Sequence, residues 1–337
     1  MAERETEVLV VGAGPTGLAT ANLLAAAGIE VTVVEREPDV AAEPRAVSVD
    51  DESMRLLQSL GIPPEPTAAL VPGTGTRYYG AGGQLLAGAA SPTPPPLGHP
   101  LKNPIDHSEF TRLLLDSLRG RERAEVHFGC GLTGLELGAD GAVATLATAA
   151  GEERMAARFV LGCDGGRSNV RGLLGIAMRG SSVDQPWLVI DTVGDPHDER
   201  YAMHHGDPTR PHVILPGPNG RCRYEFLLLE GEDEGEATSF ETARRLLERH
   251  RGPVSPADVV RQQVYVFHAL LAERWRVGAV FLLGDAAHMM PPFAGQGLST
   301  GLRDAANLSW KLAAVLRGRL GEPVLASYEQ ERRPHAR

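Results

Sequence analysis

Val8-Leu-Val-Val-Gly-Ala-Gly-Pro-Thr-Gly17 is the stretch that decides the fold of this 337-residue chain. The apolar run at residues 7–11 predicts a buried strand, residues 15–28 predict a helix, and residues 30–35 predict a second strand. A strand, a helix and a strand within about thirty residues form a parallel crossover unit. The stretch therefore predicts an α/β fold with a glycine-rich turn between its first strand and first helix.

The turn has the pattern Gly12-x-Gly14-x-x-Gly17. Gly12 permits the tight turn, Gly14 lets the backbone approach a pyrophosphate, and Gly17 lets the helix pack closely on the strand. The pyrophosphate would lie at the helix N-terminus, where free N–H groups and the helix dipole favour negative charge. Glu35 ends the second strand and can accept hydrogen bonds from a ribose diol. The pattern predicts a dinucleotide site, but it does not distinguish NAD from FAD.

A second motif, Gly284-Asp-Ala-Ala-His288, follows an apolar run at 280–283 and precedes a long helical pattern at 298–318. Asp285, at the end of a strand, can hold a ribityl hydroxyl. The N–H groups at the start of the helix can stabilise negative charge on a reduced flavin ring. This motif favours FAD.

A third motif, Cys163-Asp-Gly-Gly-Arg-Ser168, ends the predicted strand 159–163. Taken alone, this motif fits a β-turn followed by a helix cap as well as it fits a binding site.

Composition excludes several classes of protein. Lys and Arg number 33 against 43 Asp and Glu, which gives a net charge of -10 and argues against a nucleic-acid partner. Cys130, Cys163 and Cys222 are scattered, so we expect no disulfide framework and no zinc site, and a reducing cytoplasm fits best. The histidines do not cluster at ligand spacing, so no metal is expected. No apolar run reaches membrane length, and the acidic N-terminus does not resemble a signal peptide.

The remaining elements are short. Residues 61–104 are rich in Gly and Pro and predict irregular chain, and residues 231–236 predict an exposed acidic loop. The expected helices are 50–60, Ser108–Leu118 with Ser108 as its N-cap, and Phe240–Arg251. The expected strands are 125–128, 132–137, 142–148, Trp187–Thr192, His212–Leu215, Arg223–Leu229 and Val264–Ala269.

The three motifs, in this order and at this spacing, resemble those of the FAD-dependent aromatic hydroxylases, the class A flavoprotein monooxygenases typified by p-hydroxybenzoate hydroxylase. The segments Arg45-Ala-Val-Ser-Val-Asp-Asp-Glu-Ser-Met-Arg and Pro292-Phe-Ala-Gly-Gln-Gly-Leu-Ser-Thr-Gly-Leu-Arg resemble the 3-(3-hydroxyphenyl)propionate hydroxylase and polyketide hydroxylase branch. The resemblance covers nearly the whole chain.

The resemblance implies a Rossmann-like FAD-binding domain of the glutathione-reductase type with an inserted, mainly β substrate domain. The FAD-binding domain would comprise residues 1–72, 102–175 and 272–337, and the substrate domain residues 73–101 and 176–271. Relatives that resemble this chain continue past its last residue. We therefore expect either a short natural member or a truncated one that lacks the C-terminal region of its relatives.

The same resemblance implies roles for individual residues. Glu35 would bind the adenosine ribose, Arg45 would meet phosphate or ribityl oxygens, and Asp164 would serve both FAD and nicotinamide binding. Pro292 and Gly295 would form the environment of the flavin ring, with no acid or base assigned. The expected cofactor contacts are Gly12, Gly14, Pro15, Thr16, Gly17, Glu35, Arg36, Arg45, His107 (where the family often has Gln), Asp164, Asp285, Pro292, Gly295, Gln296, Gly297 and Leu298.

The implied reaction begins when NADPH or NADH reduces FAD. Reduced flavin adds molecular oxygen to give a C4a-hydroperoxide, which hydroxylates a phenolic, aromatic or polyketide substrate. His204, His205, His212 and Tyr224 lie in the expected substrate sheet and are interpreted as ordinary sheet residues, and His288 as structural. The expected partner is a small molecule, with neither nucleic acid nor a membrane, and self-association into a homo-oligomer stays open.

Two alternatives remain. The first is another FAD-dependent oxidoreductase on the same scaffold, such as a halogenase or a ring-forming oxidase. Trp187 lacks the Trp-x-Trp-x-Ile-Pro context of the halogenases, which counts against them. The second alternative is an FAD-binding module without activity. The sequence specifies neither the substrate nor the choice between NADPH and NADH.

Overall fold

The predicted crossover unit is present at the N-terminus. In the computed structural model, which describes residues 4–40, 43, 45–62, 69–182, 185–292 and 295–337, β1 (Arg4–Val11) pairs in parallel with β2 (Val31–Glu35). Helix α1 (Pro15–Ala26) connects the two strands. Val8, Leu9 and Val10 are fully buried, as the continuous apolar run requires for a parallel strand covered on both faces.

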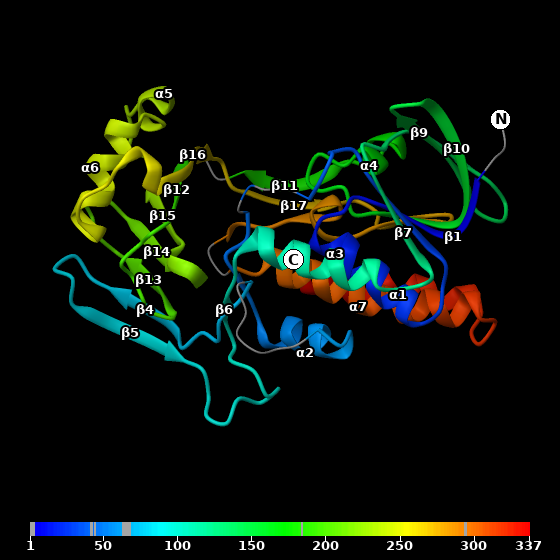
Figure 1. The fold of residues 1–337 in the computed structure, drawn as a ribbon, viewed down its shortest axis with the longest axis horizontal. Coiled ribbons are helices and arrows are strands. Elements are labelled where there is room, and N and C mark those ends of the chain that lie inside the picture. Colours follow the sequence, from blue (N-terminus) through cyan, green and yellow to red (C-terminus); the bar gives the residue numbers. More distant parts are fainter. Residues whose placement is uncertain (1–3, 41–42, 44, 63–68, 183–184, 293–294) are drawn as a thin grey trace.

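The strands around β1 form the larger sheet, in the order β18-β19-β10-β1-β2-β7. Helices α3 (His107–Arg119) and α7 (Gly297–Leu316) pack beside α1 and lie along the sheet (Figure 1). We call this unit the large lobe. Its other strands are β7 (Ala124–Phe128), β8 (Gly131–Leu137), β9 (Ala142–Thr148), β10 (Gly151–Gly162), β18 (Arg276–Val277) and β19 (Val280–Leu282).

A second sheet has the order β16-β12-β15-β14-β13-β4-β5. Together with α5 (Glu234–Ala237) and α6 (Phe240–Arg251), which cover its outer face, it forms the small lobe (Figure 1). Its strands are β4 (Gly75–Tyr79), β5 (Leu85–Ala90), β12 (Trp187–Thr192), β13 (Tyr201–His205), β14 (His212–Pro216), β15 (Cys222–Leu227) and β16 (Val259–Tyr265).

The two faces of the sheet at the central strand β15 have different surroundings. Successive side chains of a strand point to opposite faces of the sheet. Tyr224 and Phe226 join a core cluster with Leu247 of α6. Arg223 and Glu225 therefore point to the opposite face, toward the large lobe, and both are buried.

Short elements join the two lobes. A three-stranded sheet with the order β11-β17-β20 lies between them. The elements not yet named are β3 (Ser48–Val49), α2 (Asp51–Ser59), β6 (Asn103–Pro104), α4 (Asn169–Leu173), β11 (Met178–Ser182), β17 (His268–Ala272), β20 (His288–Met289) and α8 (Ser327–His335).

Several local predictions were wrong. Residues 61–104 are not all irregular, because they include the hairpin of β4 and β5; β5 is exposed throughout and carries no alternation of apolar and polar residues. The expected strand Val264–Ala269 is two strands in different sheets, since the chain crosses between the lobes after Tyr265. The expected loop 231–236 already contains the first turn of α5.

The N-cap of α3 was also misplaced. Asp106, not Ser108, caps this helix, and its Oδ1 accepts hydrogen bonds from the backbone N–H groups of Ser108 (3.0 Å) and Glu109 (3.2 Å). Asp and Ser are both favoured at N-caps, and the N-cap lies two residues earlier than the sequence pattern indicated.

Within the described ranges, no helix is long and apolar enough to cross a membrane. No group of three His, Cys, Asp or Glu side chains in the same ranges could hold a metal ion. Cys130, Cys163 and Cys222 are free and buried.

Candidate functional site

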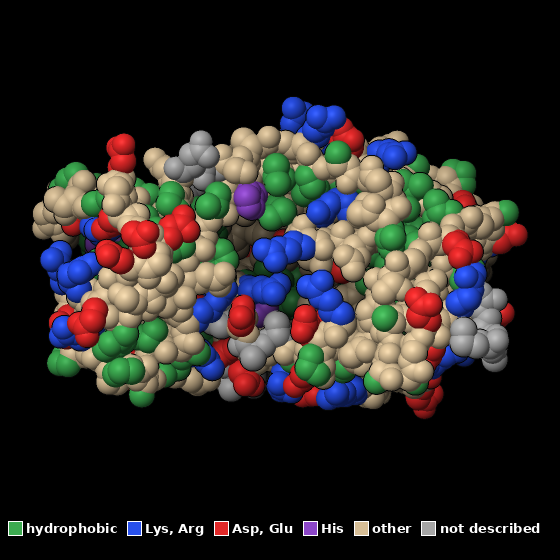
Figure 2. All heavy atoms as spheres, turned by 90° about the horizontal axis from the view of Figure 1, so that it is seen from above, with side chains coloured by type: hydrophobic (Ala, Val, Ile, Leu, Met, Phe, Trp, Pro, Cys, Tyr) green, Lys and Arg blue, Asp and Glu red, His purple; other side chains and the backbone are tan. Residues whose placement is uncertain are grey.

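A cavity of about 860 Å³ lies between the two lobes and is lined by residues of both. Seen from above, the molecule is hollowed between the lobes, and Lys and Arg side chains gather around the hollow (Figure 2). The volume falls in the range of small-molecule and cofactor sites. The cavity contains both the glycine-rich turn of the large lobe and the inward face of the second sheet.

The glycine-rich turn forms one wall of the cavity. Gly12 has a φ of 107°, which favours glycine, and a Cβ on Gly17 would lie 2.0 Å from the carbonyl oxygen of Gly12. A Cβ on Gly14, in contrast, would meet no atom within 4 Å. Gly12 and Gly17 are therefore required by packing within the protein, whereas Gly14 faces open space that a ligand can fill.

The N-terminus of α1 points into the same cavity. Its N-cap, Gly14, provides no side-chain hydrogen bond, so the first N–H groups of the helix stay available to an anion. Glu35 lies beside this end. Its Oε2 accepts from the backbone N–H of Ala13 (2.8 Å), and its Oε1 accepts from that of Glu37 (3.0 Å). These bonds fix the carboxylate at the cavity wall and leave lone pairs for further donors.

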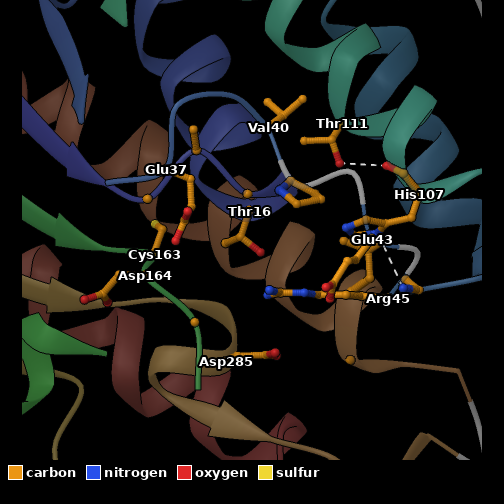
Figure 3. A pocket seen from close by; sticks show the side chains of 18 of the residues that line it. Thr16, Glu37, Val40, Glu43, Arg45, His107, Thr111, Cys163, Asp164 and Asp285 are labelled. Carbon is orange, nitrogen blue, oxygen red and sulfur yellow. Dashed lines mark hydrogen bonds between the residues drawn. The ribbon is translucent and has the colours of Figure 1, made fainter. Parts of the chain in front are cut away.

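Asp164 and Asp285 reach the cavity from strands that end next to the turn (Figure 3). The Asp164 Oδ2 accepts from the backbone N–H of Val170 (3.0 Å), while its buried Oδ1 has no partner in the described part of the chain. The Asp285 carboxyl is open to the cavity although protein surrounds it. Burial raises the pKa of Asp285, and His288 and Arg45 oppose this shift. Both carboxyls thus offer acceptors to a ligand.

Arg45 and His107 enter the cavity from the side opposite Asp164 and Asp285 (Figure 3). The His107 Nδ1 accepts a long hydrogen bond from the backbone N–H of Ala46 (3.4 Å). Burial, with Arg45, Arg223 and Arg261 nearby, lowers the pKa of His107 to about 4. The ring is therefore neutral at pH 7, and its Nε2 can act as a hydrogen-bond donor.

The start of α7 forms another part of the cavity wall. Pro292, Gly295, Gly297 and Leu298 line it, and the helix has no side-chain cap at its N-terminus. Gln296 does not line the cavity, and its Oε1 instead accepts a hydrogen bond from Arg303 (3.1 Å). The free N–H groups of α7 can face an anionic group placed here.

A buried carboxylate holds the Asp285 turn in place. Asp304 of α7 is fully buried, and its Oδ2 accepts from the backbone N–H of Gly284 (3.1 Å) and contacts the Nε2 of His288 (2.6 Å). Its Oδ1 accepts from Arg332 of α8 (2.8 Å). His288 is fully buried and does not line the cavity, in agreement with the structural role expected for it.

The structure brings most of the expected contact residues to one cavity. Two do not line it: Gly17, which acts by close packing, and Gln296. The expected residues that do line it are Gly12, Gly14, Pro15, Thr16, Glu35, Arg36, Arg45, His107, Asp164, Asp285, Pro292, Gly295, Gly297 and Leu298.

Residues that sequence reasoning missed line the part of the cavity next to the small lobe. They are Lys102, just before β6, and His204, Val213, Leu215, Arg223 and Glu225 of the small-lobe sheet. His204 was noted but interpreted as an ordinary sheet residue. One signal was present in the sequence: Arg223 and Glu225 alternate with apolar residues in a predicted strand, a pattern typical of a sheet with one polar face.

Comparisons with known proteins agree with this geometry. Residues 5–337 match a family model described as an FAD binding domain. The chain is 38% identical over 334 residues to a 3-(3-hydroxyphenyl)propionate/3-hydroxycinnamic acid hydroxylase of Comamonas testosteroni, covering 99% of this chain and 56% of that protein. The chain thus spans less than two thirds of this relative.

Solved structures show the same fold. A ternary complex of aklavinone-11 hydroxylase with FAD and aklavinone superposes with a TM-score of 0.86 at 29% identity, covering 100% of this chain and 67% of that one. A p-nitrophenol 4-monooxygenase from Pseudomonas putida DLL-E4 gives a TM-score of 0.90 at 26% identity, covering 98% and 85%.

Proposed function

Because the chain belongs to the FAD-binding domain family, we propose that it holds FAD in the cavity between the lobes and hydroxylates a phenolic or polyketide substrate with NADPH or NADH and molecular oxygen. The observation that carries the proposal is that one cavity joins the dinucleotide-type turn of the large lobe to the polar face of the second sheet. A cofactor and a substrate can therefore meet there.

The residues present fit FAD. Open space at Gly14 and the uncapped N-terminus of α1 suit a pyrophosphate, and the fixed carboxylate of Glu35 suits a ribose diol. The unpartnered oxygen of Asp164 and the open carboxyl of Asp285 suit hydroxyl donors such as those of a ribityl chain. The start of α7 suits the pyrimidine end of a flavin.

When bound, FAD would supply the electron transfer from NAD(P)H and the activation of oxygen. The chain's own residues would position the cofactor and the substrate and shield them from water. Pro292 and Gly295 would lie against the flavin ring, and the N–H groups at the start of α7 would stabilise negative charge on it. The neutral His107 would donate a hydrogen bond from its Nε2, and Arg45 would donate hydrogen bonds to phosphate or ribityl oxygens.

The two lobes have separate roles in this proposal. The large lobe corresponds to a Rossmann-like FAD-binding domain made of residues 1–72, 102–175 and 272–337. The small lobe corresponds to an inserted substrate domain made of residues 73–101 and 176–271. Two observations support this division: the strands of the two main sheets do not pair with one another, and the main core cluster of the large lobe is separate from the core clusters of the small lobe. A cytoplasmic location and self-association stay predictions.

The substrate class follows from the relatives. Their names refer to a phenylpropionate, to aklavinone and to a nitrophenol. Arg223, Glu225 and Lys102, at the small-lobe end of the cavity, supply polar contacts for hydroxyl or acidic groups, and Val213 and Leu215 supply apolar contacts for a ring. A small phenol is therefore the first substrate to test.

The test combines binding and turnover. Purified protein is expected to retain FAD and, with 3-(3-hydroxyphenyl)propionate, to consume NADPH or NADH while an atom of labelled dioxygen enters the phenol. Reduced-cofactor consumption with peroxide release but no labelled product from any phenol would favour another flavin oxidoreductase. Bound FAD without consumption would favour a module without activity, and absence of FAD binding would overturn the proposal.

A further inference from the structure

A carboxyl group without a partner lies in the middle of the second sheet. Glu225 of β15 is 7% exposed and lines the cavity. Among the residues that the structure describes, its carboxyl makes no hydrogen bond and no ion pair. The backbone and stem of Glu225 are buried, whereas its carboxyl opens into the cavity, so a group in the cavity can reach it. A ligand with a proton to donate would satisfy this group.

The strand register shows that Glu225 faces the cavity. Glu225 pairs with Val213 of β14, and Val213 pairs with His204 of β13. Residues directly opposite one another on paired strands lie on the same face of a sheet. All three line the cavity, so the carboxyl belongs to its wall and not to the core beneath α6. Strand β15 is paired on both sides, with β12 and β14.

Charged neighbours surround Glu225 without pairing with it. Arg223 is already engaged, because its Nε and Nη2 donate to Asp191 (2.7 and 3.1 Å) and its Nη1 donates to the carbonyl oxygen of Arg45 (2.5 Å). Burial raises the pKa of Glu225, the nearby Arg223 and Lys102 oppose the shift, and Asp191 adds to it. A carboxyl with a raised pKa is a stronger base than an ordinary glutamate.

Lys102 links this end of the cavity to the start of α7. Its Nζ would lie 3.8 Å from a Cβ placed on Gly295, and Gly295 lines the proposed flavin-ring site. Burial is the larger cause of the lowered pKa of His204, and the Lys102 ammonium group is the second. His204 also lines the cavity. A ligand between Glu225 and Gly295 would therefore have a carboxyl on one side and an ammonium group nearby.

We propose that Glu225 accepts the proton of an acidic hydroxyl group on the substrate and that Lys102 stabilises the anion that results. This rests on the proposed function and names its substrate class as phenols or enols. The substrate O–H bond breaks, a new O–H bond forms on a Glu225 oxygen, and the electron pair stays on the substrate oxygen. The ring of the phenolate is richer in electrons, which favours attack on an electrophilic oxygen atom. This step consumes no oxidant.

The ionisation of a bound phenol can be observed directly. 4-Nitrophenol is yellow only as the anion, so its spectrum in the complex reports its protonation without turnover. At a pH where the free phenol is mainly neutral, the FAD-loaded wild type is expected to bind it as the anion. Glu225→Gln keeps the size of the side chain but cannot take a proton, and is expected to bind it as the neutral phenol.

Two further variants complete the design. Glu225→Asp retains a carboxyl and is expected to restore part of the yellow complex. Glu248→Gln, on the outer helix α6, is the matched control and is expected to behave as the wild type. Thermal melting and flavin content show that each variant is folded and loaded.

Turnover gives the second readout. With 3-(3-hydroxyphenyl)propionate, Glu225→Gln is expected to lower kcat by about 100-fold, the lower end of general-base effects, and to change KM much less. If this variant binds nitrophenol as the anion as fully as the wild type, the inference is wrong and the proposed function stands. If the wild type binds neither phenol and consumes no NAD(P)H with them, both are wrong.

Discussion

Asp164 and Asp285 show how single residues build the flavin end of the cavity. Each ends a parallel strand of the large sheet, and each leaves at least one carboxyl oxygen free for a ligand. Asp164 is oriented by a backbone N–H, while Asp285 stands on a turn fixed from below by Asp304. Under the proposed function, these free oxygens would accept hydrogen bonds from hydroxyl groups of FAD.

Asp285→Ala is expected to weaken FAD binding. A buried ribityl hydroxyl would lose its acceptor, at a cost of about 1–3 kcal/mol, or about 5- to 150-fold in affinity. Fluorescence titration of the flavin-free protein measures the effect. Asp140→Ala, at a carboxyl on the surface, is the control. Unchanged affinity in Asp285→Ala would count against this placement of the flavin.

The glycines of the turn give a paired prediction. Gly17→Ala is expected to lower the Tm of the flavin-free protein, because its Cβ would overlap the carbonyl oxygen of Gly12; overpacking of this kind costs about 1–3 kcal/mol. Gly14→Ala is expected to leave that Tm unchanged, since its Cβ meets nothing within 4 Å, but to weaken FAD binding. Equal effects on Tm would contradict this distinction, which differential scanning fluorimetry measures.

Sequence alone identified much of the site because its glycines and aspartates stand in local patterns. The turn from Gly12 to Gly17, Glu35 and Asp285 could each be placed at a strand end. Lys102 and Glu225 could not be assigned to the cavity, because their position depends on strand pairings and on a chain crossing far away in the sequence. Gln296 was expected to contact the cofactor, but it does not line the cavity, because its side chain accepts a hydrogen bond from Arg303, one that a local pattern does not predict.

Among the elements, helix α7 holds the turn that carries Asp285 in place. Asp304 joins the segment that runs from Gly284 to His288 with Arg332 of helix α8, which lies more than forty residues later in the chain. The Asp304 side chain is fully buried, and its two oxygens accept several hydrogen bonds. A buried carboxylate is tolerated under that condition. The position of Asp285 therefore depends on residues that never line the cavity.

The outer face of the second sheet holds a stack of histidines. The His205 and His212 rings are 4.3 Å apart and nearly parallel, and the His250 ring of α6 lies 4.4 Å from that of His212. Tyr79 and Phe226 enclose the stack. Burial, followed by the neighbouring imidazoles, lowers the pKa of His205 and His250 to about 4, and burial lowers that of His212.

The histidine stack predicts a loss of stability in acid. An unfolded histidine titrates near pH 6.5, above the folded pKa of about 4. The unfolded state thus binds more protons between these values, and the free energy of unfolding falls as pH falls from about 6.5 toward 4. It is fully retained above that window. Asp207, which favours the charged form of His205, does not reverse the shift.

Thermal melts at a series of pH values test this expectation. The Tm of the wild type is expected to fall steeply within the window, and His250→Gln to show a shallower slope because one proton-binding group is removed. Replacement of the exposed His127 is the control and is expected to keep the wild-type slope. Parallel slopes for the wild type and His250→Gln would contradict the prediction.

Two strands that were not predicted from the sequence, β5 and β13, share one property: their residues lack the apolar pattern of a buried strand. Strand β5 is exposed along its whole length, so it carries no apolar periodicity. Strand β13 consists of Tyr, Ala, Met and His, which do not form a typical strand pattern. Elements with a strong buried run, such as β1 and β12, were predicted correctly because burial on both sides selects continuous apolar residues.

Over the whole molecule, the lobes are joined by polar contacts beside the cavity. Arg221 of the small lobe pairs with Asp106, the N-cap of α3, and Arg223 bonds to the carbonyl oxygen of Arg45. A ligand in the cavity would add contacts to both lobes at once. The α/β class was predictable from the first strands, whereas the meeting of the two lobes depends on contacts between distant segments.

Binding of FAD is therefore expected to raise the Tm of the entire chain in one transition. At a free concentration 100 times Kd, binding adds about 2.7 kcal/mol, which for 337 residues corresponds to about 4 °C. Scanning calorimetry with and without FAD measures the shift. A shift confined to one of two separate transitions would show that only one lobe contacts the cofactor.

The strand order of the large sheet also has a consequence for synthesis of the chain. Strand β1 has both of its strand partners, β2 and β10, once residue 162 is made, but β10 gains its outer partner β19 only at residues 280–282, and α1 is covered by α7 only from residue 297. At about 5–20 residues per second, the open edge of β10 waits about 6–24 s for β19, and the apolar surface of α1 waits about 15–50 s for α7. Nascent chains of this protein are therefore expected to engage chaperones before the last strand of the sheet emerges.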